Sequence, residues 1–241
     1  MKHLSLVFVI FSLFFLFGCE GENVISPEAD VTNRGIGEIH NEFLTNVYNE
    51  LDENSSNLMK TTALEEEEIL YQEAKKITDK YNQDPLTREQ VREALERGRN
   101  MAKQDPIELV KSILSPEEYK WWDRFSNEAT AVNLDLIYKN MCAKYGAPKP
   151  GTILYSLCDI SIHSAEFWLT RHSAEEIPNI KIDSRNLLRG WGKRLLRFTV
   201  TVVVDGASGA AAGSGTGGNL IVAGVVGGLC SHAADDIIFG D

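Results

Sequence analysis

The residues with the clearest potential for chemistry lie in one segment, 152–172. His163 and Glu166 are three positions apart there, and His172 follows nine positions after His163. Imidazole and carboxylate groups on the helices of a bundle can hold a metal ion, typically in a Glu-x-x-His pattern. Here the order is reversed and occurs once, so the three residues are weak metal candidates. We favour the alternative that they cap helices or lie on the surface.

Other catalytic signatures are absent from the sequence. No serine has a Gly-x-Ser-x-Gly context, and no His-Glu-x-x-His motif, P-loop or dinucleotide fingerprint occurs. The glycines at 206–218 lack the Lys-Ser/Thr that completes a phosphate loop, and no βαβ pattern precedes them. We therefore expect no catalytic residue, no resident metal and no cofactor.

The first 34 residues predict where the protein is located. Lys2 precedes an apolar run at 4–17 that only two serines interrupt, which is the pattern of a secretory signal. The run is shorter than the ~20 apolar residues that a membrane-spanning helix needs. We expect residues 1–18 to form a cleaved signal peptide and the polar, acidic residues 19–34 to form a flexible tether.

The end of this run, Leu16-Phe17-Gly18-Cys19, resembles the bacterial lipobox, in which a small residue precedes the cysteine that receives a diacylglycerol. The resemblance implies lipidation of Cys19, with fatty acids such as palmitate. Several acyl chains, at ~0.8 kcal/mol per buried CH₂, would hold the chain stably on a membrane. The predicted location is the bacterial cell envelope, lipid-anchored to the outer membrane on its periplasmic or surface face. The alternative is a plain signal peptide that ends near a cysteine.

The two ends of the mature chain resemble uncharacterised lipoproteins of the Bacteroidota. The residues concerned are Gly35-Ile-Gly-Glu-Ile-His-Asn-Glu42 and the glycine-rich end that opens with Asp205-Gly206-Ala207. The resemblance covers these ends and not the middle, and it implies an envelope location without a known activity. From the residue types, we expect His40 and Asn41 to cap or bridge neighbouring helices.

Charge and cysteine content restrict the partners. The formal net charge is −11, and it becomes −12 once residues 1–18 and their single lysine are removed, which argues against a nucleic-acid partner. Besides Cys19 there are three cysteines. Cys142 and Cys158 flank a Pro/Gly turn and could pair between antiparallel helices, whereas the alternative that we favour is that both, with Cys230, are buried thiols.

Apolar residues recur at spacings of three and four nearly throughout, and strand-like alternation is scarce. The pattern predicts an all-α fold, an irregular helical bundle with a C-terminal glycine-rich helical hairpin. A helical domain is expected at 35–183, and its helices are expected at 37–51, 63–81, 87–103, from 115 onward, 129–145 and 152–172. The second of these is expected to pack through Leu64, Ile69, Leu70 and Ile77.

Residues 184–241 are expected to form a basic amphipathic helix followed by the glycine-rich hairpin. The basic helix would lie on an anionic membrane or pair with acids such as those at 65–68. The hairpin arms are expected at 199–212 and 220–234, and they resemble glycine-zipper segments. Glycine in a helix costs about 1 kcal/mol relative to alanine, so its repetition predicts closely packed backbones. The predicted helix-packing positions are Gly209, Gly213, Gly217, Gly224 and Gly228.

These observations predict a lipid-anchored envelope protein that is not an enzyme. It would act by binding or assembly through its helical surface, with the membrane, a second copy or another envelope protein as partner. The main alternative is a hairpin that inserts into or stabilises the membrane. We favour a hairpin packed in the protein, because Asp205 interrupts one arm and the other is shorter than the ~17 residues needed to cross. A metal-dependent hydrolase built on His163, Glu166 and His172 has the least support.

Overall fold

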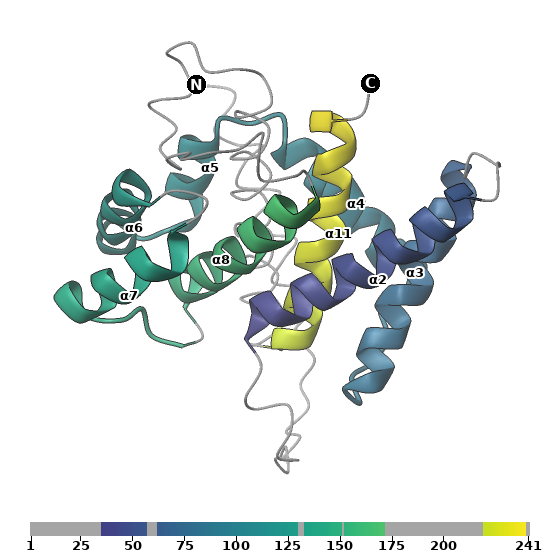
Figure 1. Ribbon diagram of the computed structural model, residues 1–241, viewed down its shortest axis with the longest axis horizontal. Coiled ribbons are helices and arrows are strands. Elements are labelled where there is room, and N and C mark those ends of the chain that lie inside the picture. The colour runs from purple at the N-terminus through teal and green to yellow at the C-terminus, as the bar shows by residue number, and fades with distance from the viewer. Residues whose placement is uncertain (1–34, 57–61, 130–132, 151, 172–218, 240–241) are drawn as a thin grey trace, which may run out of the picture. The chain divides into compact units, whose positions relative to one another are not determined.

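The computed structural model describes residues 35–56, 62–129, 133–150, 152–171 and 219–239 (Figure 1). Within these ranges the regular structure is entirely helical, which confirms the predicted all-α class. The helices are α2 (Ile36–Ser56), α3 (Ala63–Lys80), α4 (Arg88–Met101), α5 (Pro106–Ile113), α6 (Pro116–Glu128), α7 (Leu134–Tyr145), α8 (Ile153–Arg171) and α11 (Leu220–Phe239).

Several predictions fall on residues outside these ranges. They concern the signal peptide, Cys19, the tether, His172, the basic helix, and the first hairpin arm with Gly209, Gly213 and Gly217. Among the described residues, no helix combines the length and the apolar character that crossing a membrane requires.

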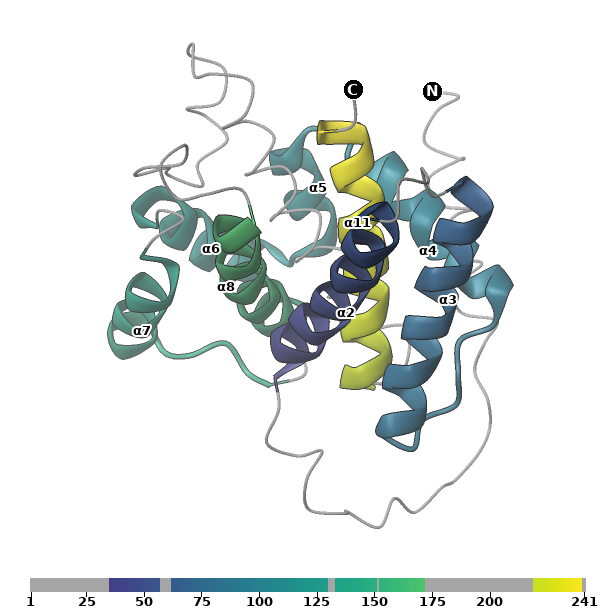
Figure 2. The same cartoon turned by 45° about the vertical axis from the view of Figure 1, so that its right-hand side comes forward.

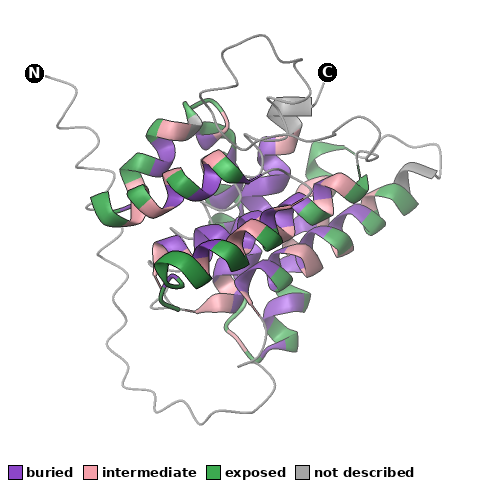
Figure 3. Cartoon of the chain, turned by 60° about the vertical axis from the view of Figure 1, so that its left-hand side comes forward, coloured by how far each residue is buried: buried purple, intermediate pink, exposed green. Residues whose placement is uncertain are grey.

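Helix α11 runs through the interior of the bundle between α2 and α4 (Figure 1 and Figure 2). Every residue from Ala223 to Ala234 is buried, and the inward faces of the surrounding helices are buried with them (Figure 3). A helix that is apolar on all sides is stable in water only as an interior element. The contacts of α11 with α2, α3 and α4 place it in the same compact unit as residues 35–171.

Glycines bring the neighbouring backbones close to α11. A Cβ added at Gly98 of α4 would lie 2.6 Å from the Cys230 Cα and would also meet the Cys230 carbonyl oxygen. On the other side of α11, a Cβ at Gly224 would lie 2.7 Å from the Cβ of Ile39 in α2, and one at Gly228 would meet the Phe43 ring. Glycine therefore stands at closely packed contacts on both sides of α11.

One helix boundary and one packing residue differ from prediction. Helix α11 continues to Phe239 instead of ending at 234, because Asp235 accepts a 2.8 Å hydrogen bond from the Tyr48 hydroxyl and so remains within the helix. Leu64 is 79% exposed, so its predicted packing role is wrong. The capping box between Thr62 and Glu65 places Leu64 in the first turn of α3, ahead of the buried Leu70 and Ile77.

Helix α5 is an element that the sequence pattern did not predict. Its start is a local signal: Asp105 accepts hydrogen bonds from the amides of Ile107 (2.8 Å) and Glu108 (3.2 Å), and Pro106 occupies the first helical turn. The aromatic residues of α6 divide between core and edge. Trp122 and Phe125 are buried, whereas Trp121 packs against Tyr138 at the margin.

The three described cysteines are free thiols. Cys158 and Cys230 are buried, whereas Cys142 is half-buried, so the expectation of three buried thiols is correct for two of them. Burial, with Cys142 and Asp159 nearby, raises the pKa of the Cys158 thiol well above its usual value. The Cys230 thiol donates a 3.1 Å hydrogen bond to the Ala94 carbonyl of α4.

The contact at Gly98 yields a test of the packing. Gly98→Ala should lower the free energy of unfolding by about 1–3 kcal/mol, because the new methyl group would meet the backbone of Cys230 rather than a movable side chain. At an open helical position the same change would stabilise by about 1 kcal/mol. Chemical denaturation of the purified chain, residues 19–241, measures the difference. Asn100→Ala, at an exposed position of the same helix, is the control, and a Gly98→Ala protein as stable as that control would contradict the packing.

Candidate functional site

The start of α2 is held against α8 by the motif that the sequence singled out. The Gly37 amide donates a 2.8 Å hydrogen bond to Oδ2 of Asp159, which satisfies a free donor at the helix N-terminus. Asn41 donates from Nδ2 to the His163 carbonyl at 2.8 Å. Gly37 has no room for a side chain, since a Cβ there would lie 2.6 Å from the Asp159 carbonyl oxygen. Asn41 therefore bridges two helices.

His40 directly precedes Asn41 on α2, and its side chain is completely buried. The His40 pKa is lowered to about 4, and burial is the largest cause; the hydrogen bond to Asn41 raises the pKa in opposition, and the nearby His163 adds to the lowering. His40 is therefore neutral at pH 7, and its Nδ1 donates to Oδ1 of Asn41 at 3.0 Å. This bond orients the Asn41 amide toward α8.

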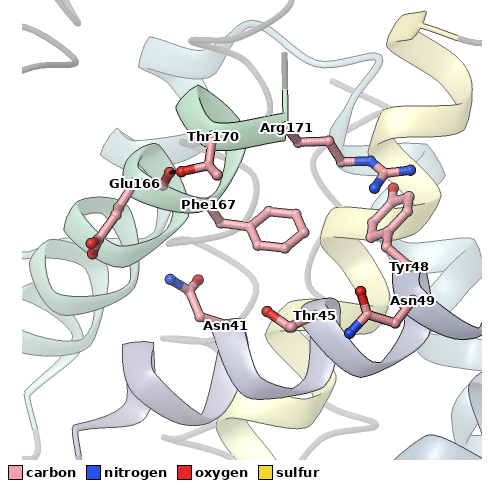
Figure 4. Close-up of a pocket in the computed structure, with 8 residues that line it drawn as sticks. All are labelled: Asn41, Thr45, Tyr48, Asn49, Glu166, Phe167, Thr170 and Arg171. Atoms are coloured by element: carbon pink, nitrogen blue, oxygen red, sulfur yellow. Dashed lines mark hydrogen bonds between the residues drawn. The ribbon is translucent and has the colours of Figure 1, made fainter. Parts of the chain in front are cut away.

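An open groove of about 490 Å³ follows this junction along α2 and α8 (Figure 4). Its α2 wall carries Asn41, Thr45 and Asn49, which are four positions apart and share one face of the helix. Its α8 wall carries Glu166, Phe167, Thr170 and Arg171, and Tyr48 lies near Arg171 at one end. The lining is thus made of amides, hydroxyls, two aromatic rings and one charge of each sign.

Contacts with the core hold the Tyr48 end of the groove in place. The Tyr48 hydroxyl donates to Oδ2 of Asp235 in α11 at 2.8 Å, and the Tyr48 ring lies 5.8 Å from that of Phe167. The Arg171 guanidinium lies 3.8 Å from the centre of the Tyr48 ring and donates to both carboxylate oxygens of Asp52 at 3.2 Å. The one cation of the groove is therefore already paired.

A second polar contact lies behind Tyr48, between α11 and α3. His232 is 3% exposed, packs edge-on against Tyr48, and donates from Nε2 to Oε1 of Glu66 at 2.6 Å. This hydrogen bond is the largest cause of a lowered Glu66 pKa, and the charges of His232 and Arg99 add to it. The two carboxylates that follow Glu66 are also paired, since Glu67 forms a salt bridge with Arg92 and Glu68 forms one with Arg88 of α4.

Among the described residues, the candidates His163 and Glu166 do not form a metal site. His163 donates from Nδ1 to the Asp159 carbonyl at 2.8 Å, Glu166 is exposed at the groove, and His172 lies outside the described residues. Within the described part of the chain, no group of three or more His, Cys, Asp or Glu side chains is arranged to hold a metal ion.

Sequence reasoning named Asn41 and Glu166 for other roles and missed the groove that they line with six further residues. The polar ridge at 41, 45 and 49 lies opposite the apolar stripe of α2, so by itself it resembles an ordinary solvated face. Only the position of α8 beside it makes a groove. One signal in the sequence is the pair Phe167 and Arg171, which are four positions apart and so share a face of α8.

Comparison with protein-family models, curated proteins and solved structures finds no match to the chain. The chemistry of the groove therefore has to be judged from its own side chains. They offer hydrogen-bond donors and acceptors beside an aromatic surface.

The burial of His40 predicts a pH dependence. Its pKa is about 4 in the folded chain and near 6.5 when unfolded, so the unfolded chain binds more protons between these values. Its contribution to stability should be complete above pH 6.5 and should decrease by roughly 3 kcal/mol as the pH falls toward 4. Chemical denaturation across this range should show a shallower slope in His40→Gln than in the wild type.

The same histidine can be observed directly. In an NMR titration of the folded chain, the His40 ring signals should stay constant from pH 8 to pH 5. A His40 midpoint near 6.5, or identical slopes for wild type and His40→Gln, would show that the ring is not held neutral by burial.

Proposed function

We propose that the chain is a lipid-anchored cell-envelope protein that binds a ligand or partner in the groove between α2 and α8. The observation that carries this proposal is the groove itself, in which exposed polar side chains surround the Phe167 and Tyr48 rings on two mutually braced helices. Sites whose walls are already held in place lose little conformational freedom on binding. A role in binding therefore fits this geometry better than a catalytic role.

The groove replaces the hairpin as the proposed contact surface. The sequence pattern favours the glycine-rich hairpin as the contact element, but α11 is buried and its Gly224 and Gly228 face Ile39 and Phe43 of the same chain. A surface already covered by α2 and α4 is closed to a partner. The groove residues Thr45, Asn49 and Glu166, in contrast, are exposed.

The proposed anchor is the lipid on Cys19, which the likeness of residues 16–19 to a lipobox supports. The 16 residues from 19 to 34 would then link the lipid to the start of α2. Fully extended, a tether of this length reaches about 50 Å, far enough for the groove to meet ligands beyond the membrane surface. The acidic net charge of −11 supports a partner other than nucleic acid.

Within the part of the chain that the structure describes, neither alternative function gains a supporting contact. Membrane insertion of the glycine-rich segment would require α11 to leave its contacts with α2 and α4 and break the Tyr48–Asp235 hydrogen bond. Hydrolysis assisted by a metal would require His163 and Glu166 to converge, whereas Nδ1 of His163 is bound to a carbonyl within its own helix.

The anchor is tested by replacing the acylated residue. In the native host, the wild-type chain should fractionate with membranes, and mass spectrometry should find a diacylglycerol and fatty acid on Cys19. Cys19→Ser should be released into the soluble fraction, because no acyl chain then holds it. Retention of Cys19→Ser in the membrane would instead support an inserted hairpin, and an unmodified mature amino terminus would exclude the lipid anchor.

Occupancy of the groove can be measured in the envelope itself. Thr45→Cys, in a Cys142→Ser background, should react with a maleimide more slowly in intact envelopes than in the purified chain, because a bound ligand shields the exposed Thr45 position. Lys120→Cys in the same background places the thiol at an exposed site on α6 and should react equally in both. Equal rates at position 45 would contradict a binding role for the groove.

A further inference from the structure

We infer that the groove binds a short neutral saccharide, an inference that rests on the binding function proposed above. Four features of the described residues support it: the balance of charge in the groove, its aromatic surface, its hydroxyl and amide groups, and its dimensions.

The charges of the groove do not favour an anionic ligand. Arg171 is the one cation among the eight lining residues, and it is held by both Asp52 oxygens and by the Tyr48 ring. A phosphate or carboxylate would have to displace Asp52 to reach it, and the exposed Glu166 adds a negative charge at the opposite end of the lining (Figure 4). A neutral ligand has neither cost, and the Glu166 carboxylate can accept hydrogen bonds from its hydroxyl groups.

The uncharged side chains match the two-sided chemistry of a sugar ring. A pyranose has an apolar C–H face and an edge of hydroxyl groups that both donate and accept hydrogen bonds. Phe167 projects between the two helices and is only half-buried, so it offers a flat apolar surface (Figure 4). Thr45 and Asn49 are exposed on the facing wall, and each can donate and accept.

The remaining wall residues are already used to hold the groove in shape. Asn41 is bound to His40 and to the His163 carbonyl, and the Thr170 hydroxyl donates to the Glu166 carbonyl at 3.0 Å. Ligand contacts are therefore assigned to Thr45, Asn49, Glu166 and Phe167. A ligand bound to these residues does not have to break the hydrogen bonds of Asn41 and Thr170.

The dimensions of the groove fit a di- or trisaccharide. Asn49 lies eight positions after Asn41 on α2, a length of about 12 Å at the helical rise of 1.5 Å per residue. The volume of about 490 Å³ lies in the usual range for small-ligand sites. An extended peptide is less well matched, because it binds mainly through backbone groups along a strand edge, and both walls here are helices with internally paired backbones.

The test is an NMR titration of the mature chain carrying Cys19→Ser, with assigned resonances. The probes are maltotriose, cellotriose and chitotriose at millimolar concentrations, with tri-alanine as the peptide probe. At least one trisaccharide should cause saturable shifts that centre on Thr45, Asn49 and Phe167. Tri-alanine should not.

Three variants separate the aromatic contact from the stability of the fold. Phe167→Leu keeps an apolar side chain but removes the flat ring, so it should weaken saccharide binding about tenfold. Phe167→Tyr keeps the ring and should bind the saccharide more tightly than Phe167→Leu does. Leu136→Ala, at an exposed position of α7, is the control and should also bind normally.

The inference is overturned if none of the three trisaccharides causes saturable shifts, if their shifts centre elsewhere, or if only tri-alanine binds the groove. It is also overturned if Phe167→Leu binds as tightly as the wild type. Shielding of position 45 in intact envelopes, together with no saccharide binding, would leave the proposed binding function standing and reject the ligand class. Absence of that shielding would reject the proposed function itself.

Discussion

The close approach of α11 to α2 and α4 is the constraint on which the rest of the structure depends. Gly98, Gly224 and Gly228 stand where a side chain would meet the neighbouring helix, so these positions set the spacing of three helices at once. The cost of glycine in a helix, about 1 kcal/mol each, is offset by burial of an otherwise unstable apolar helix. The glycine-rich end is thus an interior element of the fold between Ala223 and Ala234.

This packing also determines what α2 presents to solvent. Its inner side, with Ile39 and Phe43, is taken by α11, which leaves the ridge at 41, 45 and 49 to form one wall of the groove. Helix α8 forms the other wall, and two hydrogen bonds, from Gly37 and from Asn41, join it to the start of α2. Tyr48 connects the two regions, because its ring lies in the groove and its hydroxyl binds Asp235 of the interior helix.

Local patterns predicted much of this fold. Spacings of three and four identified most of the helices, and the starts predicted for α3, α4 and α6, at 63, 87 and 115, agree with the observed starts to within one residue. Three features escaped prediction for physical reasons. The short α5 has too few turns for a periodic signal. Leu64 is apolar and so resembles a core residue, but the N-cap at Thr62 places it in the exposed first turn of α3. The groove depends on contacts between residues more than 100 positions apart, such as Asn41 with His163, which periodicity within one segment does not encode.

The most direct test of the interior position of α11 uses the native thiols. In the reduced, detergent-free mature chain carrying Cys19→Ser, a maleimide should modify the half-buried Cys142 readily, while Cys230, packed against Gly98 and bonded to the Ala94 carbonyl, should react only after the chain unfolds. Modification of Cys230 as fast as Cys142 in the folded chain would contradict the central claim, because it would mean that α11 is not held between α2 and α4.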